Sequence, residues 1–231
     1  MKVTLLVTLI LSSCSVFAAS GNVIDWSGFY VGGNVGYGSG HKQDKSDSDA
    51  WGESFSGING GLQVGHNWQY NNNFVLGVVA NLSLSDMSDD YKNSDNQKYD
   101  PYDGSVSIKQ NGSVDLMLGY AFDEFMPYVK TGISVAKEEY SLGCHKNNTT
   151  ITTGCKLAEF ESSESNISAG LNIGAGFQYE ITNNLSAGIE YTYVDLGSSS
   201  VYLHDPNYPT HGSRNFNTSY STTTLNVNYL F

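Results

Sequence analysis

The sequence predicts an all-β protein: an eight-stranded antiparallel transmembrane β-barrel with short periplasmic turns and four long extracellular loops. Three observations support this prediction. Apolar and polar residues alternate along eight segments, short and long connections alternate between the segments, and aromatic residues gather near the short connections. In a membrane barrel the apolar row faces lipid and the other row faces a polar interior, because successive side chains of a strand point to opposite faces.

The alternation is clearest at the C-terminal end, in residues 223–231. Leu225, Val227, Tyr229 and Phe231 fall on one face, and the chain stops on that last aromatic residue. An apolar face with an aromatic residue at its rim is typical of an outer-membrane barrel strand. We therefore expect Tyr229 and Phe231 to act as the C-terminal assembly signal.

Seven earlier segments repeat this period of two, and no helical period competes with it. In the fourth segment, Val106 and Ile108 are expected to face lipid in the same row as Leu116. The expected segments are residues 29–37, 58–68, 74–85, 106–122, 129–135, 166–179 and 185–193.

The connections differ in length on the two sides of the predicted barrel. The tight turns, built on residues that favour turns, are 70–73, 123–125 and 181–184. The expected extracellular loops are residues 39–56, 86–104, 137–165 and 195–214. Short turns opposite long loops are the usual asymmetry of outer-membrane barrels. Acidic pairs in the loops, such as Glu138 and Glu139, are expected to be solvated charge.

Aromatic residues give a third, independent indication, because their amphipathic rings collect at membrane–water interfaces. A soluble β-sandwich would explain the alternation but not this clustering. The expected periplasmic belt contains Trp26, Phe29, Tyr30, Trp68, Tyr70, Phe74, Tyr120, Phe122, Phe125, Tyr128, Phe177, Tyr179, Tyr229 and Phe231. The expected outer belt contains Tyr37, Tyr140, Tyr191, Tyr193 and Tyr220.

Residues 1–19 are predicted to be a signal peptide, which leaves residues 20–231 as the barrel domain. Lys2 supplies the positive start, residues 3–11 the apolar middle, and Val16-Phe17-Ala18 a small-residue cleavage site. The apolar stretch is too short for a membrane helix. The alternative is a lipoprotein signal, in which Cys14 would be lipidated.

Composition excludes one class of partner. The chain has 11 Lys and Arg residues and a formal net charge of −12, which argues against nucleic-acid binding, since that needs clustered basic residues. After removal of the signal, Cys144 and Cys155 remain. In an exported chain an even cysteine count predicts a disulfide, and two free thiols are the alternative.

The predicted interior contains a few charged residues. Lys109, Asp115, Lys130 and Glu190 fall on inward-facing rows, so we expect an interior charge network in which Lys130 pairs with Asp115 or Glu190. An eight-stranded barrel is just wide enough for its own side chains to fill. A structural network is therefore the preferred interpretation, and a gated or water-filled passage is the alternative.

No pattern of catalytic or metal-binding residues is present, so the protein is predicted not to be an enzyme and to hold no metal. No cofactor is predicted, although haem is the one alternative. The haem candidates are the loop histidines His41, His145, His204 and His211, because neutral imidazole ligates haem iron. The acidic loops favour divalent cations that bridge to lipopolysaccharide phosphate, or a basic host surface.

The stretch Trp26-Ser27-Gly28-Phe29-Tyr30-Val31-Gly32-Gly33-Asn34-Val35-Gly36-Tyr37-Gly38, together with the terminal strand, resembles a known family. It is similar to the alphaproteobacterial outer-membrane surface antigens, opacity-protein-like or porin-family small β-barrels that include haemin-binding proteins of Bartonella and Brucella type. The resemblance implies a bacterial outer-membrane location, insertion by the barrel-assembly machinery, and surface exposure.

That family membership implies a structural role and an adhesin-like or antigen-like role through the extracellular loops. A haemin-binding protein and a small porin-like channel are the alternatives. Some family members bind haemin, but no haem motif maps residue by residue onto this chain. The expected partners are outer-membrane lipid and lipopolysaccharide, the assembly machinery, and a host surface component or haemin.

Overall fold

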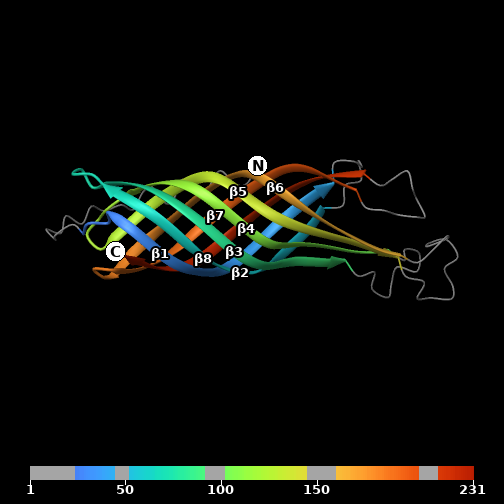
Figure 1. The fold of residues 1–231 in the computed structure, drawn as a ribbon, viewed down its shortest axis with the longest axis horizontal. Coiled ribbons are helices and arrows are strands. Elements are labelled where there is room, and N and C mark those ends of the chain that lie inside the picture. The colour runs from blue at the N-terminus through green and yellow to red at the C-terminus, as the bar shows by residue number, and fades with distance from the viewer. Residues whose placement is uncertain (1–23, 45–51, 92–101, 145–159, 203–212) are drawn as a thin grey trace, which may run out of the picture.

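The computed structural model describes residues 24–44, 52–91, 102–144, 160–202 and 213–231. They form a closed barrel in which each antiparallel strand pairs with the next in sequence and the last pairs with the first (Figure 1). The strands are β1 (Gly28–Asp44), β2 (Gly52–Gln69), β3 (Phe74–Tyr91), β4 (Tyr102–Tyr120), β5 (Phe125–Cys144), β6 (Phe160–Thr182), β7 (Leu185–Tyr202) and β8 (Ser213–Leu230). The predicted fold class is confirmed. The described residues contain no helix long and apolar enough to cross a membrane.

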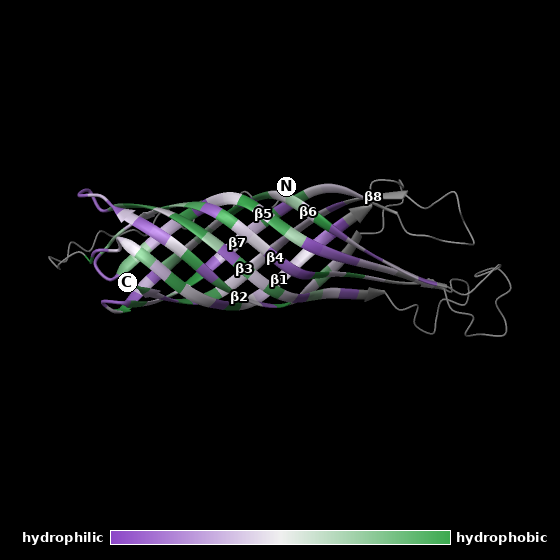
Figure 2. Ribbon diagram, viewed as in Figure 1, coloured by the Kyte–Doolittle hydropathy of each residue, from purple (hydrophilic) through white to green (hydrophobic). Residues whose placement is uncertain are grey.

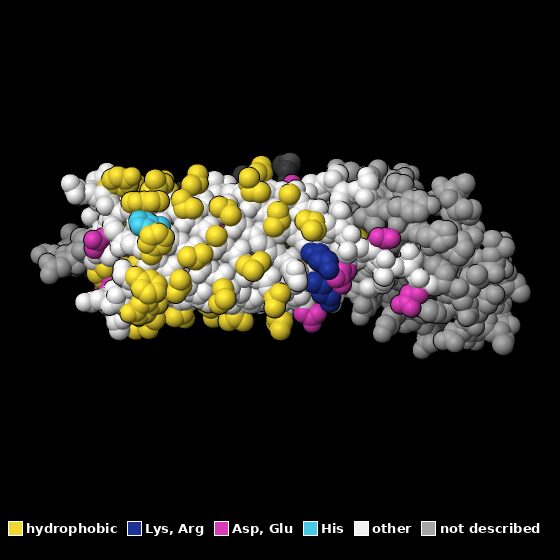
Figure 3. All heavy atoms as spheres, viewed as in Figure 1, with side chains coloured by type: hydrophobic (Ala, Val, Ile, Leu, Met, Phe, Trp, Pro, Cys, Tyr) yellow, Lys and Arg dark blue, Asp and Glu magenta, His cyan; other side chains and the backbone are white. Residues whose placement is uncertain are grey.

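The outward row of each strand is apolar over the half of the barrel nearest the short turns. Leu62, Leu82 and Ile167 are each more than two-thirds exposed. Hydrophobic side chains form a broad belt on the face shown in Figure 3, and Figure 2 shows apolar and polar bands alternating along the strands. Exposed apolar area on this scale is unfavourable in water but suits contact with lipid acyl chains.

Inward glycines make room for large side chains from neighbouring strands. A methyl group on Gly65 would overlap the ring of Tyr30, one on Gly40 would overlap Phe55, and one on Gly38 would overlap Met87. The interior of this narrow barrel is therefore filled by pairing residues without side chains with bulky ones. This agrees with the small width expected of eight strands.

Gly170 tests this close packing. Its replacement by alanine is expected to lower the free energy of unfolding by about 1–3 kcal/mol, because the new methyl group would overlap backbone atoms of Asp195 and Leu196 rather than a movable side-chain end. Urea unfolding in detergent micelles, followed by tryptophan fluorescence, measures the change. The matched control is Gly33→Ala, whose methyl group meets its nearest neighbour, the Gly61 carbonyl oxygen, at 3.8 Å. Equal stabilities for the two variants would contradict the prediction.

The strands are longer than the sequence predicted. They contain 17 to 23 residues, whereas about 9–11 suffice to span a bilayer. Much of the four predicted loops is therefore strand, and the loop boundaries 39–56, 86–104, 137–165 and 195–214 were wrong. The physical reason is that the outer face also becomes polar beyond the hydrophobic belt, at residues such as Ser54, Ser56 and Ser163. A strand with two polar faces has no alternation to detect.

Bulges also changed which way side chains point. The β4–β5 register shifts between Ile108 and Gln110, so Val106 and Ile108 are buried inside the barrel and do not face lipid as predicted. An extra residue in one strand reverses the facing of everything beyond it. A second shift follows Asp195 in the β7–β8 pairing, where Gly197 adopts a φ of 67°, a conformation that favours glycine.

Five of the predicted belt aromatics are buried instead. Trp26, Tyr30 and Tyr128 point into the short-turn end of the barrel, and Tyr140 and Tyr220 point into its outer half. Period two assigns Tyr30, Tyr128, Tyr140 and Tyr220 to inward rows, so closeness to a turn was not sufficient to place them. Outward-facing aromatics at the short-turn end are Phe29, Trp68, Tyr70, Phe74, Phe122, Phe125, Phe177, Tyr179, Tyr229 and Phe231.

Candidate functional site

The described interior of the barrel is arranged in three layers. At the short-turn end an apolar cluster contains Trp26, Val75, Met117, Ala121, Met126 and Tyr128. In the outer half a second apolar cluster contains Phe55, Met87, Ile108, Ala136, Val194, Leu196 and Tyr220. Between them lies a polar layer centred on a buried lysine. We call these the inner apolar layer, the outer apolar layer and the polar layer.

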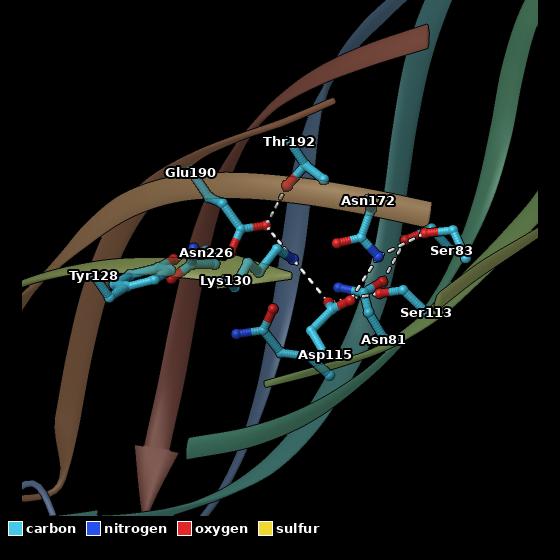
Figure 4. Close-up of polar contacts among 12 residues, drawn as sticks. Asn81, Ser83, Ser113, Asp115, Tyr128, Lys130, Asn172, Glu190, Thr192 and Asn226 are labelled. Atoms are coloured by element: carbon cyan, nitrogen blue, oxygen red, sulfur yellow. Dashed lines mark hydrogen bonds and ion pairs between the residues drawn. The ribbon is translucent and has the colours of Figure 1, made fainter. Parts of the chain in front are cut away.

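The polar layer is centred on Lys130 of β5. Its ammonium nitrogen lies 3.1 Å from Oδ2 of Asp115 on β4 and 2.8 Å from Oε1 of Glu190 on β7 (Figure 4). The Lys130 and Asp115 side chains are 5% and 0% exposed and that of Glu190 is 16% exposed, so the Lys130–Asp115 pair is buried and Glu190 is largely buried. Asp115 and Lys130 come from adjacent strands, but Glu190 is two strands away from Lys130.

Gly174 of β6 makes the longer reach possible. It pairs with Lys130 on one side and with Thr192 on the other. A methyl group at this position would lie 3.1 Å from Cε of Lys130. Because Gly174 has no side chain, the lysine crosses over β6 and meets the carboxylate of Glu190.

Both carboxylates of the triad are fully supplied with hydrogen-bond donors. Asp115 accepts hydrogen bonds from Ser113 Oγ at 2.8 Å and from Asn172 Nδ2 at 2.6 Å. Glu190 accepts from the Tyr128 hydroxyl at 2.9 Å and from Thr192 Oγ1 at 3.0 Å. A buried charge is tolerated when it is paired and its remaining lone pairs are satisfied. With two acids and one base, the arrangement is suited to holding strands together.

Lys109 lies outside this network, contrary to the prediction. It sits at the β4 bulge with its side chain 41% exposed, and its Nζ lies 3.5 Å from Oδ1 of Asp86. The prediction assumed an unbroken alternation from Lys109 to Asp115, and the bulge breaks that alternation. The interior ion network that was expected to have four members therefore has three.

Two further interior charges were missed from the sequence. Glu138 is fully buried and accepts a hydrogen bond from Ser168 Oγ, although it was expected to be solvated loop charge. Lys42 is buried with its Nζ 3.4 Å from the centroid of the Tyr140 ring, a cation–π contact. The overlooked signal was the alternation of inward and outward residues along the strand. Glu138 lies an even number of positions after Lys130 and therefore falls on the same inward row.

The predicted haem candidates are only partly described. His41 is exposed on the outer surface of β1, and its Nδ1 lies 2.8 Å from Ser54 Oγ. His145, His204 and His211 lie outside the described residues, so their role as ligands stays a prediction. The remaining histidine, His66, packs against the rings of Phe29 and Trp68, with 4.4 Å between centroids in each case.

The other predicted features stand as follows. Cys144 ends β5, but its side chain and all of Cys155 lie outside the part of the chain described, as do the signal peptide (residues 1–19) and Cys14. The disulfide therefore stays a prediction.

Tyr229 and Phe231 are exposed at the short-turn end with their ring centroids 5.1 Å apart, and Phe231 N donates to the Phe29 carbonyl oxygen at 2.9 Å. Their role as an assembly signal stays a prediction as well.

A recess enters the barrel from the short-turn end and reaches the polar layer. Trp26, Asn67, Glu180 and Asn184 are among the residues that line it near its mouth, and Lys130 and Glu190 line its inner part. Beyond the polar layer the outer apolar layer crosses the barrel. Its members are between 0% and 3% exposed, so among the described residues this layer is closely packed.

A closed antiparallel barrel with a hydrophobic belt, an aromatic rim and a polar interior layer defines an outer-membrane β-barrel protein. The chain belongs to the outer membrane protein beta-barrel domain family, whose model matches residues 4–231. The predicted family and the predicted bacterial outer-membrane location are thereby confirmed.

Two bacterial outer-membrane proteins are similar to the chain. The chain is 28% identical over 197 residues to the 31 kDa outer-membrane immunogenic protein of Brucella melitensis, covering 80% of this chain and 77% of that protein. It is 29% identical over 180 residues to the 22 kDa outer membrane protein of Rhizobium leguminosarum bv. viciae, covering 77% and 68%. Among solved structures, the outer membrane protein OprG from Pseudomonas aeruginosa aligns with a TM-score of 0.49 and 13% identity, covering 89% of this chain and 96% of that one.

Proposed function

We propose that the protein is a surface-exposed outer-membrane barrel that has a structural role and acts as an adhesin or antigen through its extracellular end. One observation carries the proposal: the strands continue past the hydrophobic belt as a polar-surfaced extension of the barrel. Outward residues of this extension include Ser54, Ser56, Glu139 and Ser163. An extension of this kind stands above the outer leaflet, where other cells and antibodies meet the bacterium.

Two further facts support this assignment. The Brucella relative is named an outer-membrane immunogenic protein, which is the property expected of a barrel with an exposed outer end. The interior is occupied by paired charges and apolar layers, so most of the interior side chains serve to hold the strands together.

Cysteine labelling on intact cells tests the proposed exposure. In a Cys144→Ala/Cys155→Ala background, Ser163→Cys is expected to react with a membrane-impermeant maleimide. Asn183→Cys, in the turn between β6 and β7, is expected to react only after the outer membrane is permeabilised. An antiserum raised against the refolded protein is then expected to bind intact cells that carry the protein and not cells that lack it. Reversed labelling, or antiserum binding only after permeabilisation, would contradict the proposal.

Conductance distinguishes the proposed function from the porin-like alternative. Because the side chains of the outer apolar layer are buried and an eight-stranded barrel is narrow, refolded protein in a planar bilayer is expected to show no stable unitary conductance. Stable steps whose size changes on replacing Lys130 or Glu190 would support a channel through the polar layer instead.

A further inference from the structure

Four charged side chains, which form two ion pairs, lie on the outer surface at the upper edge of the hydrophobic belt. They are Asp86 on β3, Lys109 on β4, and Lys137 and Glu139 on β5. Lys109 is the extra residue of the β4 bulge, immediately before Gln110, which pairs with Lys137. The two ammonium groups therefore belong to neighbouring strands at the same height. Figure 3 shows basic and acidic side chains gathered where the hydrophobic belt ends.

The lysines lie beside lipid-facing residues and just beyond them along the strands. Leu84 pairs with Gln110, Val135 precedes Lys137 by two positions in the same outward row, and Ile167 pairs with Lys137. Leu84, Val135 and Ile167 are 67%, 45% and 74% exposed, as expected of side chains that contact acyl chains. A long basic side chain at this edge of the belt can extend its ammonium group to the level of the lipid headgroups.

The existing ion pairs leave these lysines able to bind another anion. Lys109 Nζ lies 3.5 Å from Asp86, and Lys137 Nζ lies 3.1 Å from Glu139. All four side chains are between 39% and 75% exposed, and exposed ion pairs contribute little to stability. Each ammonium has three donor hydrogens, so a pair with one carboxylate leaves donors for a second anion. By contrast, Lys42 and Lys130 are buried.

We propose that Lys109 and Lys137 form a binding site for a phosphate group of lipid A in the outer leaflet. The lipid A phosphates lie at the boundary between acyl chains and sugar headgroup, which is the height at which these ammonium groups stand. Position and exposure carry the proposal, because this acidic chain of net charge −12 places two exposed lysines, each paired with one exposed carboxylate, on neighbouring strands at that boundary. The site would anchor the barrel to the lipid that surrounds it.

Native mass spectrometry of the refolded protein, released from detergent micelles with added lipid A, tests the site. Bisphosphorylated lipid A is expected to bind about 30-fold more weakly to the Lys109→Gln/Lys137→Gln variant than to the unsubstituted protein, since each lysine near an anionic lipid surface contributes roughly fivefold. The Lys109→Arg/Lys137→Arg variant retains the charge and is expected to keep most of the affinity. A heat-dependent mobility shift in gels shows that each variant is folded.

Three comparisons make the proposal falsifiable. Dephosphorylated lipid A is expected to bind no better to the unsubstituted protein than to the Gln variant, and equal binding of the two lipids by the unsubstituted protein would overturn the proposal. The Asp86→Asn/Glu139→Gln variant is expected to bind as tightly or more tightly. Weaker binding would show instead that the acids hold a bridging cation. Equal affinity for phosphatidylglycerol would reduce the site to general anionic attraction and would also overturn the proposal.

Discussion

Replacing Lys130 with methionine is expected to lower the free energy of unfolding by about 3–5 kcal/mol, because the substitution leaves the buried Asp115 and the largely buried Glu190 without their cation. The Lys130 ammonium lies 3.1 Å from Asp115 and 2.8 Å from Glu190, and the Lys130 and Asp115 side chains are nearly inaccessible to water. Methionine keeps much of the length and volume of the side chain, so the loss reports the charge rather than a cavity. Urea unfolding in detergent micelles measures it.

Two controls separate the charge effect from a general loss of packing. The triple variant Lys130→Met/Asp115→Asn/Glu190→Gln removes all three charges and is expected to recover most of the loss, since neutral side chains carry a smaller desolvation cost. Lys109→Met removes an exposed lysine and is expected to change stability by less than about 0.5 kcal/mol. Similar losses for Lys130→Met and Lys109→Met would contradict the buried-triad account.

Replacing Phe55 with alanine is expected to lower the free energy of unfolding by about 3–5 kcal/mol, as for other large-to-small substitutions in packed interiors. Phe55 is 1% exposed in the outer apolar layer, and its ring fills the space above Gly40. The closed sheet surrounds the site and limits how far the strands can collapse, so a cavity should remain. The same urea titration measures the effect.

The matched substitution at this position is Phe55→Met, which keeps most of the volume and is expected to cost less than about 1.5 kcal/mol. A loss for Phe55→Ala no larger than that for Phe55→Met would show that the outer apolar layer is loosely packed. The conductance prediction for the unsubstituted protein would then lose its basis as well.

The charged residues show which parts of the interior could be predicted from the sequence. Asp115 and Lys130 could be placed together because they lie on inward rows of consecutive strands joined by a tight turn. The part played by Glu190 depended on a glycine in the strand between, Gly174, whose missing side chain lets Lys130 cross β6. Lys109 was misplaced because alternation gives no warning of a bulge.

Sequence patterning alone predicted the number and order of the strands, the side of the short turns and, away from the bulges, the lipid-facing rows. These properties follow from local patterning, since period two and turn residues are read within a few positions of the chain. The three-dimensional structure was needed to show where bulges reverse that patterning, how far the strands extend beyond the belt, and that Lys130 reaches Glu190 across β6. Those features depend on register between strands distant in sequence, and no local pattern encodes the register.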